Sequence, residues 1–413
     1  MRWTLSSPDM PVLTVDAIRA QFPSMSRVHN GFPVAYLDGP GGTQVPASVA
    51  EAMRDYLLNH NANTHWEYPT SVETDALIAA SREALADFLN ASPDEIAFGA
   101  NMTTLTFHLS RAMARDWGEG DEIIVTELDH HANVDPWRQV ARDARLVVKT
   151  VPFEIVTGEL DWTALERAFT PRTRLLAIGA ASNALGTLTD VAAAARLAHA
   201  HGALCYVDAV HYAAHVLVDV RAIDCDVLVC SPYKFYGPHI GTAYIRRELL
   251  AALDAPRLAP AGTQGGERVE TGTLSHEAIV GAAAAVDFLA SLAPNSASRR
   301  AALVEVSAAL HARGQRQVER LWNGLRQISG VTVYGPPPSR PRTSTVSFVQ
   351  QGRTSTELAR HLTSRGLFAS NGDFYAQTVV ERLGHASDGL LRVGCAAYTT
   401  DEEVERVLAA VKD

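Results

Sequence analysis

An acid and a lysine each follow an apolar run, and the two runs lie close together in the sequence. The run LCYV ends at Asp208, and the run DVLVC is followed within four residues by Lys234. In an open α/β sheet, ligands bind at the edge where such buried strands end. An acid at one strand end and a lysine at the next suit a ligand that has a cationic ring nitrogen and an aldehyde carbon.

Pyridoxal 5′-phosphate carries both of these groups. Asp208 would hold the proton on the ring nitrogen, and Lys234 would bond covalently to the aldehyde carbon. A lysine that follows a turn is more often a solvated surface residue. The prediction therefore depends on the other parts of the chain that accompany Lys234.

Composition sets limits on the classes of protein to consider. With 413 residues, 47% of them hydrophobic and 20% charged, the chain can bury a large core and divide into two domains. The formal net charge of -10 gives no electrostatic footprint for nucleic acid or for an acidic membrane surface. We therefore expect a globular protein whose partners include neither nucleic acid nor membrane.

The four cysteines show no CxxC spacing, and three lie in or beside apolar runs, as buried thiols do. No metal site is predicted. The opening MRWTLSSPDMP lacks the apolar stretch of a secretion signal, and no later run has the length of a membrane span. These features favour a reducing, cytoplasmic location.

Hydrophobic periodicity predicts alternating strands and helices through most of the chain, which indicates an α/β fold. Helices are expected over residues 46–58 and 72–89, with a polar, aromatic loop between them. A long helical region from residue 277 to about 328, broken at SLAPNSAS, leads to shorter strands and helices of an α+β unit. We expect an N-terminal arm over 1–35, a large domain over 36–290 and a small domain over 291–413.

Eight pieces of the sequence together resemble the cysteine-desulfurase-like branch of the class V aminotransferases, which are fold type I pyridoxal-phosphate enzymes. In order they are NGFPVAYLDGPGGTQVP, FGANMTT, LDHHANVDPW, SNALGTLTDV, VDAVH, SPYKFYGPHIG, ETGTLS and LLRVG. One such piece is weak evidence, whereas eight in the order of the family are specific. The resemblance implies a large mixed-sheet domain that binds the cofactor and a smaller α+β C-terminal domain.

The start of a helix after the strand EIAFG is the predicted phosphate site. Asn101, Met102 and Thr103 would offer free backbone N–H groups and a hydroxyl at the positive end of that helix. A simple helix cap explains the same residues, and the resemblance favours the phosphate loop. Asn101 and Met102 replace a glycine and a threonine of the family, so that backbone donors and Thr103 must make the contact.

Three further residues are assigned to the phosphate. Ser231 could reach it, and Tyr233, which replaces a histidine of the family, could add its phenol. The resemblance also implies that Thr273 reaches the phosphate in the neighbouring subunit, which predicts a homodimer with sites at the interface.

Three polar residues are expected around the cofactor ring. The resemblance implies that His130 stacks on the ring, where its imidazole could also move protons. It implies that Asn183 donates to the ring hydroxyl oxygen or to the substrate carboxylate. His211 departs from the glutamine usual in desulfurases, while kynureninases and some epimerases have histidine there; its imidazole can still bond the ring hydroxyl oxygen. Taken alone, His130 is more often a hydrogen-bonded loop histidine, and Asn183 reads as a turn former before Gly186.

The substrate end is predicted from two further residues. Arg392, in LLRVG, aligns with the arginine that binds the carboxylate of an amino-acid substrate, and its planar guanidinium suits that role. Tyr375, in NGDFYAQT, stands where desulfurases carry the cysteine that accepts sulfur, and a phenol cannot accept sulfur as a thiolate does. Cys395 is expected to be an inert core thiol.

These residues predict an enzyme that acts on an α-amino acid through pyridoxal phosphate. The first expectation is β-elimination, a C–S or C–Se lyase reaction without an enzyme persulfide, with Lys234 as base and Tyr375 or His130 as proton donor. Transamination and racemisation or epimerisation are the alternatives. A cofactor-binding regulatory or carrier protein is the alternative without turnover. A nucleotide-binding Rossmann protein is excluded because no GxGxxG follows a predicted strand.

Overall fold

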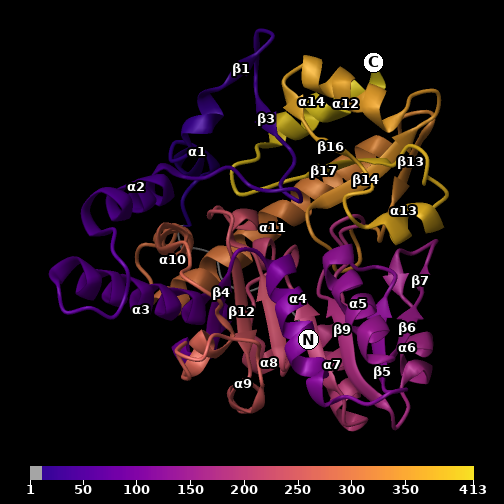
Figure 1. Cartoon of the computed structure of the whole chain (residues 1–413). Coiled ribbons are helices and arrows are strands. Elements are labelled where there is room, and N and C mark those ends of the chain that lie inside the picture. Colours follow the sequence, from indigo (N-terminus) through magenta and orange to yellow (C-terminus); the bar gives the residue numbers. More distant parts are fainter. Residues whose placement is uncertain (1–11) are drawn as a thin grey trace.

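The computed structural model describes residues 12–413, so the expectation for the opening eleven residues lies outside the described part. Its central feature is a seven-stranded sheet in the order β4-β12-β11-β10-β9-β5-β6, in which β12 alone runs antiparallel to its neighbours (Figure 1). The strands are β4 (Ile96–Gly99), β5 (Glu122–Thr126), β6 (Val147–Val151), β9 (Thr173–Gly179), β10 (Leu204–Asp208), β11 (Val227–Cys230) and β12 (Gly241–Ile245). The carboxyl ends of β4, β5, β9, β10 and β11 therefore meet at one edge.

Helices cover both faces of this sheet, because alternate residues of each strand point to opposite sides. Ile123 and Val125 of β5 pack with the helices of one face, whereas Ile124 packs with those of the other. The first face is covered by α4 (Met102–Met113), α5 (Asp135–Ala144) and α9 (Arg247–Ala252). The second is covered by α3 (Pro69–Leu89), α6 (Trp162–Ala168), α7 (Val191–Ala200), α8 (Val220–Ile223) and α10 (His276–Ser291). Burial on both faces explains the continuous apolar runs that predicted these strands.

A second, four-stranded antiparallel sheet lies beside the first, in the order β13-β14-β17-β16. Its strands are β13 (Val331–Tyr334), β14 (Thr345–Gln350), β16 (Ser370–Gly372) and β17 (Leu390–Gly394). The helices of this part are α11 (Arg299–Arg326), α12 (Ser355–Ser364), α13 (Gln377–Arg382) and α14 (Asp401–Lys412). A separate core forms between this sheet and α11, α12 and α14.

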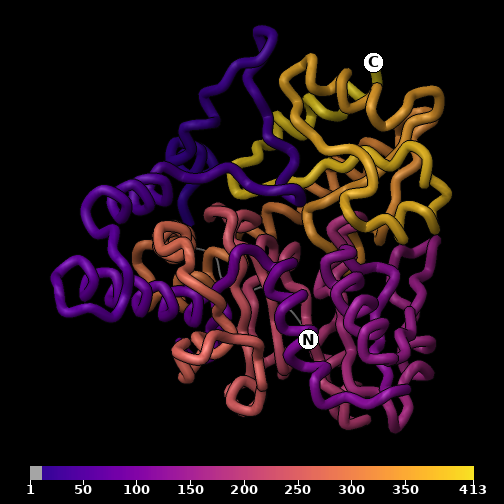
Figure 2. Tube along the Cα trace, in the orientation of Figure 1, coloured from indigo at the N-terminus to yellow at the C-terminus, as the bar shows by residue number. Residues whose placement is uncertain are grey.

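The N-terminal segment packs against both parts of the chain. Ala35 and Leu37 belong to the core of the small sheet, whereas Ile18 and Phe22 belong to the core on one face of the large sheet. It comprises α1 (Val15–Arg19), β1 (Val28–His29), β2 (Phe32–Pro33) and β3 (Ala35–Tyr36), and β3 pairs in parallel with β15 (Leu367–Phe368). Arg19 of α1 forms an ion pair of 3.0 Å with Glu403 of α14. Figure 2 follows this segment beside the yellow C-terminal part before it crosses to the large sheet.

The predicted helix over 46–58 is α2 (Ala47–Asp55), which ends three residues early because Tyr56–His60 continue as a wider π-helical turn. The hydroxyl of Tyr56 bonds Thr74 at 3.3 Å and His276 at 3.1 Å, so the turn connects α3 and α10. A short hairpin of β7 (Phe153–Glu154) and β8 (Glu159–Leu160) completes the strands. None of the described helices is long and apolar enough to cross a membrane.

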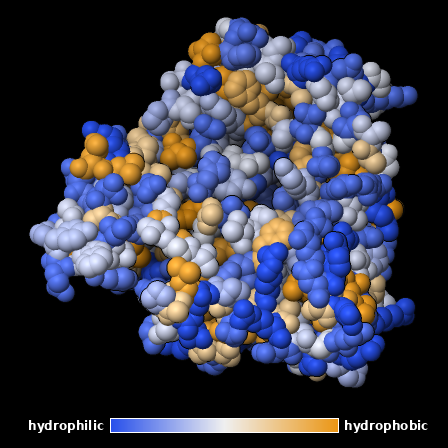
Figure 3. Space-filling model, viewed as in Figure 1, coloured by the Kyte–Doolittle hydropathy of each residue, from blue (hydrophilic) through white to orange (hydrophobic). Residues whose placement is uncertain are grey.

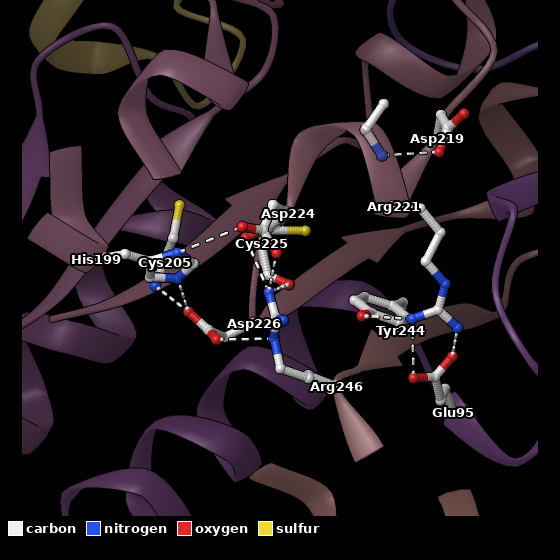
Figure 4. Close-up of polar contacts among 11 residues, drawn as sticks. Glu95, His199, Cys205, Asp219, Arg221, Asp224, Cys225, Asp226, Tyr244 and Arg246 are labelled. Carbon is white, nitrogen blue, oxygen red and sulfur yellow. Dashed lines mark hydrogen bonds and ion pairs between the residues drawn. The ribbon is translucent and has the colours of Figure 1, made fainter. Parts of the chain in front are cut away.

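At the edge of the large sheet where β11 begins, a network of charges joins the strands (Figure 4). Asp226 accepts hydrogen bonds from the Cys205 backbone N–H at 2.8 Å and from His199 at 2.9 Å, and forms an ion pair of 3.1 Å with Arg246. Asp226 immediately precedes β11, whereas Lys234 lies beyond its other end. The network therefore stabilises the edge opposite the predicted site. Polar side chains cover most of the face in Figure 3, with small apolar groups between them.

Candidate active site

Asp208 and Lys234 both lie at the carboxyl edge of the large sheet. Asp208 is the last residue of β10, and Lys234 ends a short 3-10 helix, Pro232–Lys234, that follows the neighbouring β11. Both side chains are buried. Burial raises the pKa of Asp208 to about 6, and burial, with the nearby charge of Arg392, lowers the pKa of Lys234 to about 7. A lysine amine that loses its proton near neutral pH can act as a nucleophile and as a base.

A turn of the N-terminal segment, Asp38–Gly42, lies against Lys234. The lysine Nζ donates to the Pro40 carbonyl oxygen, and the Thr43 backbone N–H donates to the Tyr233 carbonyl oxygen at 3.0 Å. A Cβ added to Gly42 would come within 3.2 Å of the Tyr233 ring. The small residues of this turn therefore permit close approach to the lysine.

Ser231 and Tyr233 flank the lysine on the same short helix. Ser231 is buried at the N-cap of that helix, and its carbonyl oxygen accepts from the Lys234 backbone N–H at 3.1 Å. The Tyr233 ring stacks on His239 with centroids 4.9 Å apart, and the lysine Nζ lies 5.1 Å from the centroid of the same ring. The structure thus brings Ser231 and Tyr233 together with Lys234.

The predicted phosphate residues form the first turn of α4. Asn101 is the N-cap, and its side-chain oxygen accepts from the backbone N–H of Thr104 at 2.8 Å and from the Thr104 hydroxyl at 3.0 Å. Met102 is buried, whereas Thr103 is exposed and available to a ligand. A Cβ on Gly241 of β12 would come within 2.4 Å of the Asn101 carbonyl carbon, so the helix start rests directly on that strand.

Thr273 lies elsewhere in the chain, on an exposed loop before α10. It lines an open cavity of about 740 Å³ together with Trp66, Leu258 and Arg82. Neither Lys234 nor Asp208 lines this cavity. The structure of one chain therefore does not bring Thr273 to the site where the other predicted residues meet.

His130 lies four residues beyond the end of β5, near the cations Lys234 and Arg392 and the acid Asp373. Its Nδ1 accepts from the Ala132 backbone N–H at 3.0 Å, and its ring stacks on Tyr375 with centroids 5.5 Å apart. Burial, with the charge of Lys234 second, lowers the pKa of His130 to about 4. The neighbouring Asp129 is buried and bonds the Gly179 backbone N–H at 2.8 Å, and burial raises its pKa to about 7.

Arg392 and Asn183 meet beneath the segment that carries Tyr375. The Arg392 guanidinium donates to the Asn183 carbonyl oxygen at 3.1 Å and to Asp38 at 3.2 Å, and it stacks on the Phe374 ring at 4.1 Å. The Asn183 amide donates to the Phe374 carbonyl oxygen at 2.9 Å. Phe374 and Tyr375 both have φ of 57°, a strained backbone for residues with a Cβ. This segment thus contacts both predicted substrate-binding side chains.

Among the buried polar atoms in the described part of the chain that lack a hydrogen-bond partner, two belong to residues predicted to contact the cofactor. They are Asn183 Oδ1 and His211 Nδ1. An unpaired buried polar atom is costly, so these atoms mark a place where a polar ligand would be stabilised. Together with Asp208, Lys234 and the α4 terminus, they match the ring nitrogen, hydroxyl, aldehyde and phosphate of pyridoxal 5′-phosphate.

Sequence reasoning missed several residues of this site, namely Asp38, Asp129, Phe374, Thr343 and Thr345. Asp38 directly follows the apolar run VAYL, and the strand-end signal that identified Asp208 could have found it; Asp129 stands four residues beyond the run IIV, where that signal is weaker. Phe374 and the two threonines carry no such signal, because they reach the site only when the small domain packs against the large sheet.

The family is shown by comparison with known proteins. The model of the family described as Aminotransferase class-V matches residues 35–407. A probable cysteine desulfurase of Vibrio cholerae is 32% identical over 421 residues, covering 97% of this chain and 98% of its own. A cysteine desulfurase of Klebsiella pneumoniae is likewise 32% identical, over 97% and 98% of the two chains.

Solved structures agree with this result. The cysteine desulfurase of Thermococcus onnurineus has a TM-score of 0.87 at 26% identity, covering 99% of this chain and 98% of its own. The cysteine desulfurase CsdA of Escherichia coli has a TM-score of 0.83 at 27% identity, covering 97% and 98%. The predicted family and fold class are confirmed. The chain belongs to the class V aminotransferases and is an enzyme that depends on pyridoxal 5′-phosphate.

Proposed function

We propose that this enzyme is a C–S or C–Se lyase that removes the β-substituent of cysteine, a cysteine conjugate or a selenium analogue without forming a persulfide on its own cysteine. The observation that carries the proposal is Tyr375, which is 74% exposed and stacked on His130. By resemblance it occupies the place of the sulfur-accepting cysteine. The relatives named cysteine desulfurase support chemistry on a carbon–sulfur bond.

The cofactor, when bound, supplies an electron-withdrawing ring that stabilises negative charge at the substrate α-carbon. Lys234 would hold it covalently and, once released by the substrate, take the α-proton on its Nζ, which a pKa of about 7 permits. Asp208 would bond the proton of the ring nitrogen. Arg392 would bind the substrate carboxylate through paired charge-assisted hydrogen bonds.

The cysteines of the chain support a reaction without a persulfide. All four are buried free thiols. Cys395 lies three residues beyond Arg392, is 2% exposed, and burial raises its pKa to about 12. A thiol in this state is protonated at neutral pH and is a poor sulfur acceptor. The sulfur should therefore leave as the β-substituent itself, which is sulfide when the substrate is cysteine. Tyr375 or the neutral His130 would donate or relay the proton.

A panel of amino acids tests the proposal, with sulfide, pyruvate, alanine and keto acids followed separately. Elimination predicts sulfide and pyruvate in equal amounts from cysteine. Alanine as the product, together with a persulfide on Cys395 by mass spectrometry and its loss with activity in Cys395→Ser, would overturn the proposal. A keto acid that retains the β-substituent of the substrate would indicate transamination, and the mirror-image amino acid would indicate racemisation. Both reactions share the first proton transfer to Lys234. Turnover of none of these amino acids would favour the regulatory or carrier alternative.

We further propose that the enzyme is a homodimer located in the cytoplasm. Four reduced cysteines are typical of a reducing compartment. The open cavity that contains Thr273 is bordered by Trp66, 61% exposed, and Leu258, 67% exposed. A second copy of the chain would cover these apolar side chains, and Thr273 would then reach the phosphate of that copy, as the resemblance implies. We also propose that the chain divides into an N-terminal arm over 1–35, a large domain over 36–290 and a small domain over 291–413.

A further inference from the structure

The segment Arg342–Thr345 leads into β14 of the small sheet. It lies against the carboxyl edge of the large sheet, where the cofactor is proposed to bind. The buried Arg342 guanidinium donates to the Leu185 carbonyl oxygen at 3.3 Å and stacks on Trp322 at 4.7 Å. The Thr343 backbone N–H donates to the Gly186 carbonyl oxygen at 2.8 Å. The segment is therefore held against the turn that follows Asn183.

The hydroxyls of this segment contact two histidines behind the site. His211 Nε2 lies 3.1 Å from the Thr343 hydroxyl and 3.2 Å from the Thr345 hydroxyl. Ser344, between them, lies 3.3 Å from His215 Nδ1, and the two imidazoles pack edge to face at 4.7 Å. The sequence TST thus places three hydroxyls against two rings.

The contacts of His211 bear on which nitrogen of its neutral ring carries the proton. A neutral imidazole carries its proton on one nitrogen, and the other nitrogen is an acceptor. Two hydroxyls at Nε2 each have a proton to donate, and this nitrogen is the partner that the structure gives to both. An Nε2 that accepts from a hydroxyl leaves the ring proton on Nδ1, which is buried and has no partner.

We propose that Thr343 and Thr345 are positioning residues that hold His211 as its Nδ1–H form, so that this N–H donates to the ring hydroxyl oxygen of the bound cofactor. An anionic or hydroxyl oxygen at that place would satisfy the one polar atom that the folded chain leaves unpaired on this ring. The inference rests on the cofactor binding beside His211, as in the proposed function.

The surroundings of His211 keep its ring neutral. Burial lowers its pKa well below the usual value, and His215, Lys234 and Arg392 act in the same direction. Burial also lowers the pKa of His215 to about 3. A neutral ring needs its tautomer fixed if it is to donate from a defined nitrogen, which is the task of the two hydroxyls.

Two paired variants test the proposal. Thr343→Val with Thr345→Val removes both hydroxyls at nearly constant volume, and Thr343→Ser with Thr345→Ser retains them. The readouts are the dissociation constant of pyridoxal 5′-phosphate for cofactor-free protein, the pH at which the visible absorbance of the bound cofactor changes, and the ¹⁵N signals of His211 in labelled, cofactor-loaded enzyme. Thr399→Val is the control, because it loses a buried hydroxyl that accepts from the Ala396 N–H at 2.9 Å.

The valine pair should weaken cofactor binding by about five- to tenfold, as expected for a lost hydrogen bond. It should also shift the absorbance transition and move the His211 signals away from the Nδ1–H form. The serine pair and Thr399→Val should match the wild-type enzyme. A valine pair with wild-type affinity and absorbance, or a wild-type His211 protonated on Nε2, would overturn the inference alone. Wild-type protein that takes up no cofactor would overturn the proposed function with it.

Discussion

Arg392 is surrounded by partners that a substrate carboxylate would have to share or replace. Its guanidinium contacts Asp38, Ser370 and the Asn183 carbonyl oxygen, with the Phe374 ring against its face. A planar fork held on three sides is oriented before the substrate arrives. An ammonium group cannot reproduce these contacts, which makes lysine a poor replacement.

We expect Arg392→Lys to cost about 2 to 5 kcal/mol in transition-state binding, seen in kcat/KM, while the absorbance of the bound cofactor is unchanged. Steady-state kinetics with the best substrate of the panel provide the measurement. Arg340→Lys is the control, because Arg340 forms an exposed ion pair with Glu159. Unchanged kinetics in Arg392→Lys would remove this residue from the substrate site.

The ionisation of Lys234 predicts how cofactor capture depends on pH. Its amine must be neutral to attack the aldehyde, and the neutral fraction rises with pH through about 7. Stopped-flow absorbance of cofactor-free protein mixed with pyridoxal 5′-phosphate should therefore show a rate that falls as pH drops below 7. Lys234→Ala should form no bond that borohydride can fix.

Asp38 raises the pKa of Lys234, so that Asp38→Asn should move this profile to lower pH. Asp143→Asn, at an exposed position of α5, should leave the profile unchanged. A capture rate in the wild-type protein that is flat between pH 6 and 9 would show that another step, or another lysine, controls the reaction.

At the scale of elements, the start of α4 depends on Gly241 of β12. A Cβ there would meet the Asn101 carbonyl oxygen and the Met102 nitrogen, each at 2.7 Å, and both are backbone atoms that cannot rotate away. We expect Gly241→Ala to displace this helix start and to weaken cofactor binding at least about tenfold, since the free N–H groups would no longer point at the phosphate.

Titration of the cofactor-free variant by absorbance measures this effect, and thermal unfolding shows whether the fold survives. Gly118→Ala is the matched control, because nothing lies within 4 Å of its added Cβ. Wild-type affinity in a folded Gly241→Ala protein would place the phosphate elsewhere.

The same elements show what could be predicted from sequence. Strands such as β10 and β11 are buried on both faces, so their apolar runs and the polar residues that end them are visible in the chain itself. By contrast, TSTVSFV indicates a strand but not that its first threonines reach His211. The contact of Phe374 with Arg392 could not be predicted either, because it depends on a left-handed backbone that nothing in the sequence DFY indicates.

For the whole molecule, the prediction concerns the cavity that contains Thr273. Sedimentation should give a particle of twice the 44.5 kDa of one chain. Trp66→Asp should weaken that dimer and lower cofactor affinity together, because an unpaired charge would be buried at the interface. Val156→Asp changes an apolar residue that is 93% exposed outside this cavity and should alter neither property. Monomeric wild-type enzyme with full activity would contradict the shared-site proposal.

The pairing of β3 with β15 also has a consequence for the order in which the protein is made. Residues 35 and 36 are translated about 330 residues before their strand partners at 367 and 368. At the usual 5 to 20 residues per second, the delay is roughly 15 to 65 s. During that interval β3 has no strand partner, and the β-bridge between Asp38 and Gly394 cannot form. The cofactor pocket therefore closes only after residues 367–394 have been translated, so the cofactor should bind after that point.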